Sequence, residues 1–305
     1  MLLWIPVPSH TTLWKAFNNF CHVPLFGGVA IIVLSLARRI GEPREWSVGS
    51  HYGLAFMGVV LLGVVSEGVQ SLSSSRQAEW SDLLLDVVGA ICALGFYATY
   101  DRNLTGRSVV WRQAPRKYIV HIGVGLVLVV AMSPILIRAY ANWDRAARFP
   151  SLCQFSSVWE MMFVQEMNSA LRIVPPPLGW GKPQADTVGQ IVFHPKRYPG
   201  IRIHEPYADW RGFSRFRFDV YSELAVARSL VIRIDDVHHN QEHADRFNKT
   251  VTISPGLNHI HIPMDDIRLA PVGRELDLSA IKTVILFALS PPEEFALYVD
   301  NLRLE

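Results

Sequence analysis

Four apolar segments, each about twenty residues long, constrain the fold of this chain more than any other feature. They span residues 17–37, 51–70, 82–100 and 118–137. Each approaches the roughly 20 residues that an α-helix needs to cross the hydrocarbon core of a bilayer. Buried helices of a globular core would also be apolar. Four in succession, rich in Gly, Val, Leu and Ile, favour transmembrane helices instead.

The apolar residues are unevenly distributed along the 305 residues, of which 50% are hydrophobic. They dominate up to about Tyr140, whereas the sequence beyond Arg148 consists of short alternating segments with many prolines and charges. The net charge of +2 is too small to indicate a nucleic-acid-binding protein. We therefore predict a transmembrane domain at 1–142, a polar linker at 143–152 and a second domain at 153–305.

Lysines and arginines in the short loops predict the orientation in the membrane. The loops after the first and third segments are rich in them: Arg38, Arg39, Arg44, Arg102, Arg107, Arg112, Arg116 and Lys117. The loop between the second and third segments has only Arg76. Loops one and three should therefore be cytoplasmic. Both termini and the second domain should lie outside the cytoplasm.

Polar side chains gather at the predicted outer ends of the first three segments, where such groups are costly and usually mark a site. Glu67 and Gln70 are three residues apart and share one helix face. Asp82 and Asp86 are four apart and share another. We expect six residues to converge on one pocket at the outer leaflet: His22, Glu67, Gln70, Arg76, Asp82 and Asp86.

Three interpretations of this pocket remain open. The residues form a polar network that clamps the helices together, or they bind or react with a lipid-linked or envelope ligand. In the third interpretation, His22 and the carboxylates hold a divalent metal ion. In an enzyme, burial would raise the pKa of one carboxylate and leave another ionised for acid–base chemistry.

The order of these polar residues carries a family resemblance. A His on the first helix is followed by E-x-x-Q, an Arg, an Asp, and then Asp86 and Gly89. This arrangement resembles the VanZ-like membrane family, named for a glycopeptide-resistance protein. Asp86 stands where the family usually has Asn, and Asn18-Asn19 stand where an Asp-Lys pair often precedes the His. The resemblance covers about residues 17–100 and implies an integral protein of the bacterial cytoplasmic membrane.

After the linker the hydrophobic period changes to two. Phe216, Phe218 and Val220 alternate with polar residues, and further alternating or apolar runs follow at 230–234, 259–262, 282–289 and 295–304. Pro-Gly and Pro-Pro pairs separate several of these runs. Many short strands with turn signals at this spacing predict an all-β sandwich.

Several short motifs follow one another in this half: Tyr198-Pro199-Gly200, Asp209-Trp210-Arg211-Gly212-Phe213, Phe218-Asp219-Val220-Tyr221, Asp245-Arg246-Phe247, Pro255-Gly256-Leu257-Asn258 and Tyr298-Val299-Asp300-Asn301. The ordered set resembles jelly-roll carbohydrate-binding modules, galactose-binding-like in fold, such as those attached to agarases and other polysaccharide enzymes. The resemblance implies a lectin-like sandwich, often with a structural calcium ion. Asp300 would be a ligand of that ion.

Sugar binding needs aromatic platforms and planar hydrogen-bonding side chains. The aromatic candidates are Trp180, Tyr207 and Tyr221, whereas Trp210 is expected in the core. The polar candidates project from the strands: Arg217, Arg233, His259 and His261. They would suit an acidic glycan if their face is concave, and would simply be solvated if it is convex. A metal site at His238, His239 and His243 is disfavoured because the segment is predicted as a loop.

The predicted fold is thus an all-α four-helix transmembrane domain followed by an all-β jelly-roll sandwich. We expect an envelope protein that handles or senses exported polysaccharide or a lipid-linked precursor. Two alternatives stay open, a membrane-embedded enzyme for a lipid-linked substrate and a β-domain that docks a partner membrane protein. No G-x-S-x-G motif supports a serine hydrolase.

Overall fold

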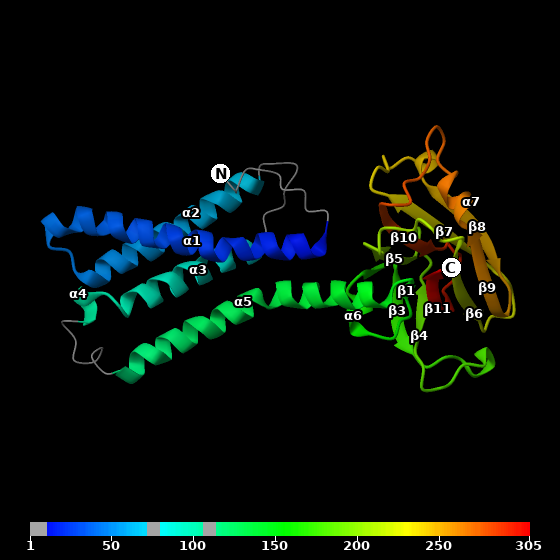
Figure 1. Ribbon diagram of the computed structural model, residues 1–305, viewed down its shortest axis with the longest axis horizontal. Helices are drawn as coiled ribbons and strands as arrows, with labels where there is room; N and C mark the ends of the chain where they lie inside the picture. Colours follow the sequence, from blue (N-terminus) through cyan, green and yellow to red (C-terminus); the bar gives the residue numbers. More distant parts are fainter. Residues whose placement is uncertain (1–10, 72–79, 106–113) are drawn as a thin grey trace. The chain divides into compact units, whose positions relative to one another are not determined.

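The computed structural model describes residues 11–71, 80–105 and 114–305 of the chain. The chain divides into two compact units, Met1–Ala139 and Tyr140–Glu305. The first unit is helical, and the second is a β-sandwich with short helical turns and the end of one long helix (Figure 1).

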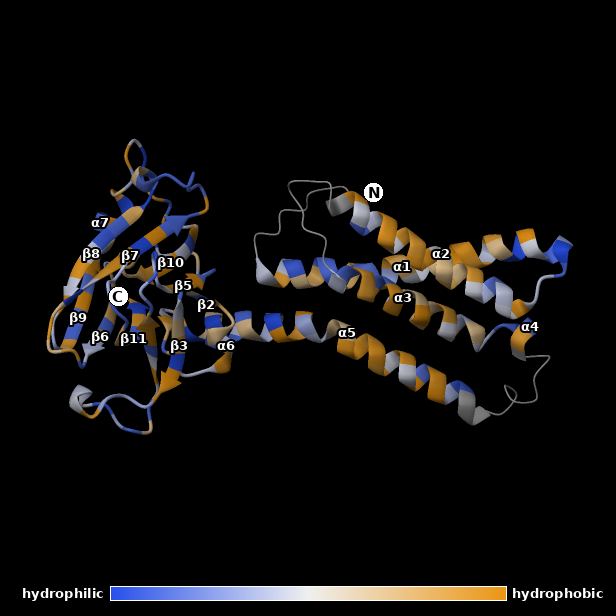
Figure 2. Ribbon diagram, turned by 180° about the vertical axis from the view of Figure 1, so that it is seen from behind, coloured by the Kyte–Doolittle hydropathy of each residue, from blue (hydrophilic) through white to orange (hydrophobic). Residues whose placement is uncertain are grey.

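The long helices of the chain are α1 (Thr12–Gly41), α2 (Val48–Ser71), α3 (Trp80–Ala98) and α5 (Ala114–Arg148), with η1 (Glu42–Arg44) and α4 (Arg102–Thr105) between them. All four are long and apolar enough to cross a membrane, as the sequence predicts, and in Figure 2 the colour of hydrophobic residues covers much of their ribbons. Some of these helices begin or end beyond the predicted apolar segments, because capping residues extend them. At the start of α1, the Thr11 hydroxyl accepts a hydrogen bond from the Trp14 N–H at 3.2 Å.

Small residues bring α1 and α3 into close contact. A Cβ atom at Gly89 would overlap the carbonyl oxygen of Val23, and one at Gly27 would lie 3.2 Å from the carbonyl oxygen of Gly89. Such backbone-to-backbone approach is how helices associate in lipid, where burial of apolar surface provides little driving force. Buried Phe26 and Leu34 of α1 belong to one apolar cluster of the helical unit.

Helix α5 does not stop at the end of the fourth apolar segment. It continues to Arg148, and β1 (Ser151–Cys153) follows directly. The segment 143–152 is therefore mostly helix and not the polar linker that the sequence indicates. Arg145 explains the continuation, since its guanidinium lies 3.9 Å from the centre of the Phe163 ring and donates to the carbonyl of Glu205.

The β-unit is a jelly-roll sandwich of two antiparallel sheets, which confirms the predicted fold class (Figure 1). Sheet A has the order β3 (Ser169–Val174), β4 (Val188–Phe193), β11 (Phe295–Leu304), β6 (Arg215–Ser222) and β9 (Gly256–Pro263), and β1 also pairs with β11. Sheet B has the order β2 (Val164–Met167), β5 (Gly200–His204), β10 (Ile281–Phe287), β7 (Arg228–Asp236) and β8 (Phe247–Ile253). The connections include α6 (Val158–Met161), η3 (Leu178–Trp180), η4 (His243–Asp245) and α7 (Met264–Arg268).

Alternation along the strands separates the core from the two outer faces. On β6, Phe216, Phe218 and Val220 are fully buried between the sheets, and Trp210 beside them is also fully buried, as predicted. The polar residues between them point outward. Gly200 allows β5 to approach β10 closely, because a Cβ there would overlap the Leu286 carbonyl oxygen.

Candidate functional site

A row of side chains crosses the outer face of sheet B, which we call face B. The strand register aligns one residue from each strand: Gln165, Arg202, Ile285, Arg233 and Asn248. Arg202 and Arg233 are thus separated by one strand, about 10 Å at the usual spacing between strands. The next row holds His204, Thr283 and Asp235.

The arginines of face B outnumber the carboxylates that face them. Arg233 donates to Asp235 at 2.8 and 3.0 Å. Within the described residues, no side-chain hydrogen bond or ion pair is seen for Arg202 or Arg246, and both Nε atoms are buried without a partner. Burial lowers the pKa of Arg246, and the neighbouring Arg233 lowers it further. This arrangement leaves donors ready for an anionic ligand.

A buried network holds the loop beside Arg233. The His239 Nδ1 lies 2.9 Å from the Asp245 carbonyl oxygen and its Nε2 lies 3.2 Å from an Arg233 nitrogen. If Nδ1 carries the proton, both contacts are hydrogen bonds. The Arg274 guanidinium spans Asp236 at 2.5 and 3.0 Å and also pairs with Asp245. Burial alone would raise the pKa of Asp236, but Arg274 holds it below its ordinary value.

Two further side chains complete face B. Burial lowers the pKa of His204, with the charge of Arg202 adding to the effect, and its Nε2 lies 2.8 Å from Gln165 Oε1. Tyr198 is 44% exposed and meets Phe287 edge to face at 5.7 Å, with Arg197 over its ring. Tyr198 is therefore an aromatic surface that a sugar ring can contact.

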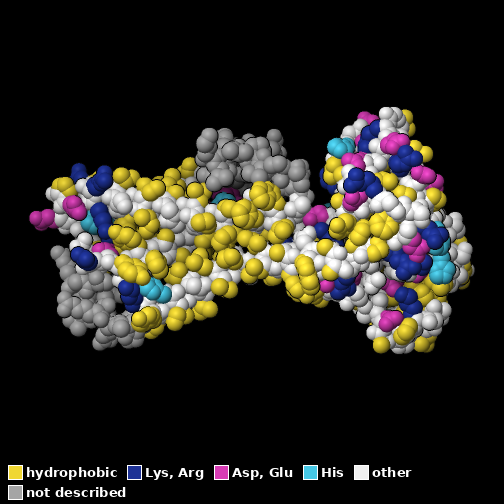
Figure 3. All heavy atoms as spheres, viewed as in Figure 1, with side chains coloured by type: hydrophobic (Ala, Val, Ile, Leu, Met, Phe, Trp, Pro, Cys, Tyr) yellow, Lys and Arg dark blue, Asp and Glu magenta, His cyan; other side chains and the backbone are white. Residues whose placement is uncertain are grey.

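Four of the sequence-predicted residues lie on the opposite face of the sandwich, the outer face of sheet A, which we call face A. Arg217 and His261 face each other across β6 and β9, His259 faces Asp219 one row further, and Tyr221 lies beyond them. Figure 3 shows histidine, basic and acidic side chains together in this part of the unit.

The charged groups of face A pair with one another. His259 Nδ1 lies 2.7 Å from Asp219 Oδ1, and the Asn301 amide donates to Asp219 Oδ2 at 2.9 Å. Glu305 accepts from Arg217 at 2.9 Å and from Arg303 at 2.5 Å. Burial would raise the pKa of Asp219, but its hydrogen bonds with Asn301 and His259 hold that pKa below its ordinary value.

Two predicted aromatic platforms are placed differently from the prediction. Trp180 is only 6% exposed, because the proline-rich segment folds back onto face A and stacks its indole on Tyr221 at 5.7 Å. It is not an open platform. Tyr207 is 38% exposed but packs against Phe149 with ring centres 4.0 Å apart.

The surroundings of Asp300 do not fit a calcium site. Its carboxylate is buried and pairs with the ammonium group of Lys182, so a protein cation already lies against it. Calcium takes six to eight oxygen ligands, and no cluster of three or more His, Cys, Asp or Glu in the described ranges is placed to hold a metal. The same finding disfavours the metal interpretation of the pocket at His22.

In the helical unit, the structure brings together part of the predicted pocket. His22 Nδ1 lies 2.7 Å from Asp86 Oδ1, and His22 Nε2 lies 3.9 Å from Asp82 Oδ2. Gly63 of α2 leaves room for Asp86, since a Cβ there would lie 3.0 Å from Asp86 Oδ2. Glu67 of α2 acts on His22 electrostatically. Arg76 and the side chain of Gln70 fall outside the described part of the chain.

A second polar cluster at the other end of the same helices is absent from the sequence prediction. Arg38 pairs with Asp101, the Tyr52 hydroxyl donates to Asp101 at 2.9 Å, and Arg38 lies over the Tyr97 ring at 5.3 Å. In the sequence, Arg38 stands out only as a signal for orientation in the membrane. The sequence feature that indicates a partner for Arg38 is Asp101, which comes directly after the third helix.

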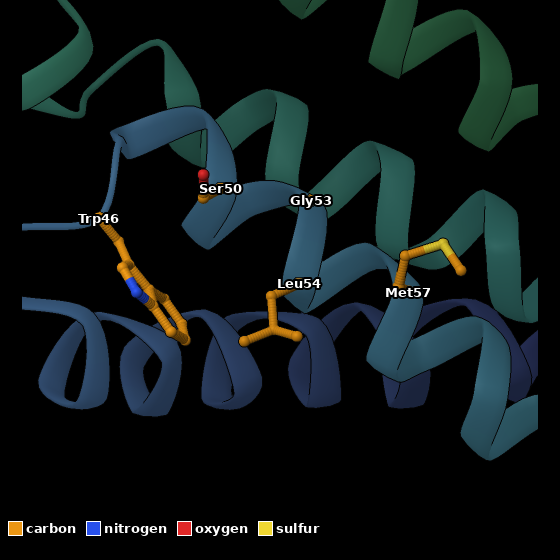
Figure 4. Close-up of a pocket in the computed structure, with 5 residues that line it drawn as sticks. All are labelled: Trp46, Ser50, Gly53, Leu54 and Met57. Atoms are coloured by element: carbon orange, nitrogen blue, oxygen red, sulfur yellow. The ribbon is translucent and has the colours of Figure 1, made fainter. Parts of the chain in front are cut away.

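The helical unit also has an apolar groove of about 440 Å³ along α2 (Figure 4). Its lining consists of Trp46, Ser50, Gly53, Leu54 and Met57. Ser50 is the one side chain among these five with a hydroxyl or charge suited to binding chemistry. The groove is therefore a poorer candidate than the polar clusters.

No protein-family model matches the sequence, and no curated protein does either. Among solved structures, the C-terminal half is similar to part of an exo-β-agarase, with 15% identity and a TM-score of 0.40 over 51% of this chain and 25% of that chain. It is also similar to a family 11 carbohydrate-binding module from Clostridium thermocellum in complex with a β-1,3-1,4-mixed-linked tetrasaccharide. That match has 16% identity and a TM-score of 0.40 and covers 50% of this chain and 93% of the module. The chain thus spans about a quarter of the agarase.

Proposed function

We propose that this chain is an integral membrane protein whose β-unit binds an acidic polysaccharide on face B. The observation that supports the proposal is the arginine row, in which Arg202 and Arg233 stand about two strand spacings apart. Arg202 has no side-chain hydrogen bond or ion pair within the described residues, whereas Arg217, whose Nε is also buried without a partner, already bonds to Glu305. An anionic ligand is therefore favourable at Arg202, since a buried donor without an acceptor costs free energy.

Carboxylate and sulfate groups are the glycan substituents that suit this face. Arginine binds planar or tetrahedral oxyanions through two parallel N–H donors, which lysine does not provide. Arg246 adds a third guanidinium near Arg233, and Asp235 is the carboxylate that pairs with Arg233. Tyr198 would contact the apolar face of a sugar ring.

The test uses the full chain in lipid nanodiscs with immobilised polysaccharides as probes. We expect binding to a polyuronate or a sulfated galactan and much weaker binding to a neutral mixed-linked β-glucan. Arg202→Gln and Arg233→Gln should each weaken binding about tenfold, the effect of losing one charge-assisted contact. Arg217→Gln on face A is the matched control and should leave the affinity unchanged.

Other outcomes have definite meanings. Stronger binding to the neutral glucan would reject the acidic ligand. If only Arg217→Gln loses binding, the glycan site lies on face A and not on face B. If a folded, monodisperse protein binds none of the probes, the proposal fails, and the β-unit is better explained as a docking module for a partner membrane protein.

We propose a second function for the helical unit, a pocket at His22, Asp82 and Asp86 for a lipid-linked envelope precursor. The helical unit would be VanZ-like, and the β-unit would lie outside the cytoplasm. The support is the contact of 2.7 Å between His22 and Asp86 inside a segment apolar enough to span the membrane. Whether the pocket also performs acid–base chemistry depends on the same pair.

Asp86→Asn tests this second function because it keeps the shape of the side chain and removes the charge. With a polyprenyl pyrophosphate as probe, the wild type should gain thermal stability and the variant should gain much less. A variant that is equally stable alone and equally stabilised by the probe would contradict a role for the carboxylate. A variant that loses stability without the probe would favour the structural clamp.

A further inference from the structure

Aromatic side chains lie close together where the end of α5 meets the β-sandwich. In this unit, the Tyr140 ring lies 5.6 Å from Trp143 and 4.8 Å from Trp159 of α6, measured between ring centres. Tyr140 is 46% exposed, Trp143 63% and the neighbouring Val158 73%. We call these four residues the junction patch.

The length of α5 fixes the depth of this patch. The apolar run at 118–137 has twenty residues, about 30 Å at 1.5 Å per residue, which matches the hydrocarbon core. Tyr140 and Trp143 follow three and six residues later, about 4.5 and 9 Å further along the axis. The headgroup layer on each side is about 5–8 Å thick, and helical side chains lean toward the N-terminus. Both rings therefore fall at headgroup depth.

Within Tyr140–Glu305, polar contacts hold α6 to the end of α5. Arg148 donates to Ser156 at 3.0 Å and pairs with Glu160 at 3.5 Å. Arg145 is held by Phe163 and Glu205, as described above. Since Trp159 touches Tyr140, α6 lies at the same level as the aromatic residues of the helix.

The chemistry of the patch also matches the headgroup layer. Trp and Tyr are enriched there because their rings are apolar and their N–H and O–H groups find water. Glu160, the acidic residue of α6, is turned inward and 8% exposed, so the outer side of α6 presents Val158. An exposed valine beside two tryptophans is unfavourable in water and favourable against lipid.

We propose that the α6 corner of the sandwich is seated in the headgroup layer of the bilayer through Tyr140, Trp143, Val158 and Trp159. Phospholipid is the partner. Gln165, the first residue of the arginine row, lies in β2 directly after this corner. Face B would then begin at the membrane surface, so a bound polymer would be held close to the bilayer.

The test measures lipid contact in the full chain. In a background with Cys21, Cys92 and Cys153 replaced by Ala, a spin label is attached at Val158→Cys in liposomes of phosphatidylcholine and phosphatidylglycerol at a low protein-to-lipid ratio. Leu126→Cys, in the middle of α5 and 63% exposed, is the lipid reference. Val272→Cys, 79% exposed before β10, is the water reference. The relaxation rate of each spin label is measured with oxygen, which concentrates in lipid, and with a nickel chelate, which stays in water.

We expect the ratio of oxygen to nickel accessibility at position 158 to be several times that at position 272. An equal ratio would overturn the proposal. Low accessibility to both reagents would also overturn it, because it would indicate a protein contact. If the cysteine-free background does not fold, brominated lipids replace the labels. They should quench the fluorescence of the wild type more than that of Trp159→Phe, and equal quenching would count against lipid contact.

Discussion

The two outer faces of the sandwich carry similar residues but pair them differently. On face A, Arg217 and Arg303 share Glu305, and Asp219 is held by His259 and Asn301. On face B, no side-chain hydrogen bond or ion pair is seen for Arg202 or Arg246 within the described residues. A buried Nε without a partner occurs on both faces, at Arg202 and Arg246 and also at Arg217, but another nitrogen of Arg217 bonds to Glu305. A face whose charges neutralise each other stabilises the fold, whereas a face with an excess of one charge can attract a ligand.

The largest expected effect is the loss of stability when Arg274 is replaced. Arg274 has a structural role, unlike the arginines of face B. Replacing Arg274 by Met leaves the fully buried Asp236 carboxylate without its cation. We expect the free energy of unfolding of the β-unit to fall by about 3 kcal/mol. Chemical denaturation followed by near-ultraviolet circular dichroism measures this loss.

Arg268→Met provides the control for this change. Arg268 pairs with Asp265 and Glu275, which are both well exposed, so its removal should change stability far less than the removal of Arg274. Equal losses in the two variants would show that the Arg274 network is no more than a surface pair.

Acid should weaken the same network. Burial would raise the pKa of Asp236 but Arg274 lowers it, and Arg274 also brings the pKa of Asp245 to about 2. Because both values lie below those of the unfolded chain, the stabilisation is complete above about pH 4 and is lost as the pH falls toward 2. We expect a constant melting temperature from pH 7 to 5 and a decline below 4. Asp236→Asn should flatten that decline, and an unchanged slope would exclude Asp236 as its source.

The sequence predicts the elements of this molecule better than their contacts. Four long apolar segments are enough to predict the four helices, and the hydrophobic period of two is enough to predict the sandwich. Both signals can be read from residues that are neighbours in the sequence. The end of α5 is different. Asp144 and Arg148 indicate a polar linker, yet they pair with each other on the last turn of a helix. Their contacts with α6 come from residues that the sequence alone does not bring near them.

The same limit applies to the sites. The contact between His22 and Asp86 follows from helix ends that meet at one side of the membrane, so the spacing of the polar residues is enough to predict it. Arg202 escapes prediction although Ile201-Arg202-Ile203 alternates clearly. Its importance depends on Arg233 standing in the same row, and strand order determines that. Trp180 fails as a platform for a similar reason, since its loop packs on Tyr221.

A pair of variants compares the two faces directly. Arg217→Met removes the contact with Glu305 on face A and should lower the free energy of unfolding by about 1 kcal/mol, with glycan affinity unchanged. Arg246→Met removes a guanidinium without a partner in the described residues and should leave stability unchanged or slightly raised while affinity falls. Denaturation and glycan binding are measured on both. If both variants lose stability and neither loses affinity, the distinction between the faces is wrong.

The smallest expected effect is a pH dependence of binding that comes from His204 of face B. Burial and the charge of Arg202 lower the pKa of His204, so this side chain is neutral at pH 7.5 and gains a proton only at a lower pH than an ordinary histidine does. The new positive charge should strengthen binding of a sulfated polymer, whose own charge is constant in this range. We expect a gain of about two- to fourfold between pH 7.5 and 5, as for one exposed charge pair.

His204→Gln should abolish this gain, whereas His261→Gln on face A, the matched control, should preserve it. Surface plasmon resonance on nanodiscs at fixed ionic strength measures both, because added salt would screen the effect. A gain that disappears with His261→Gln and persists with His204→Gln would assign the glycan site to face A. In that case the closed pairing of face A would have to open on binding, since Arg217 and Asp219 could contact a ligand only by releasing their present partners.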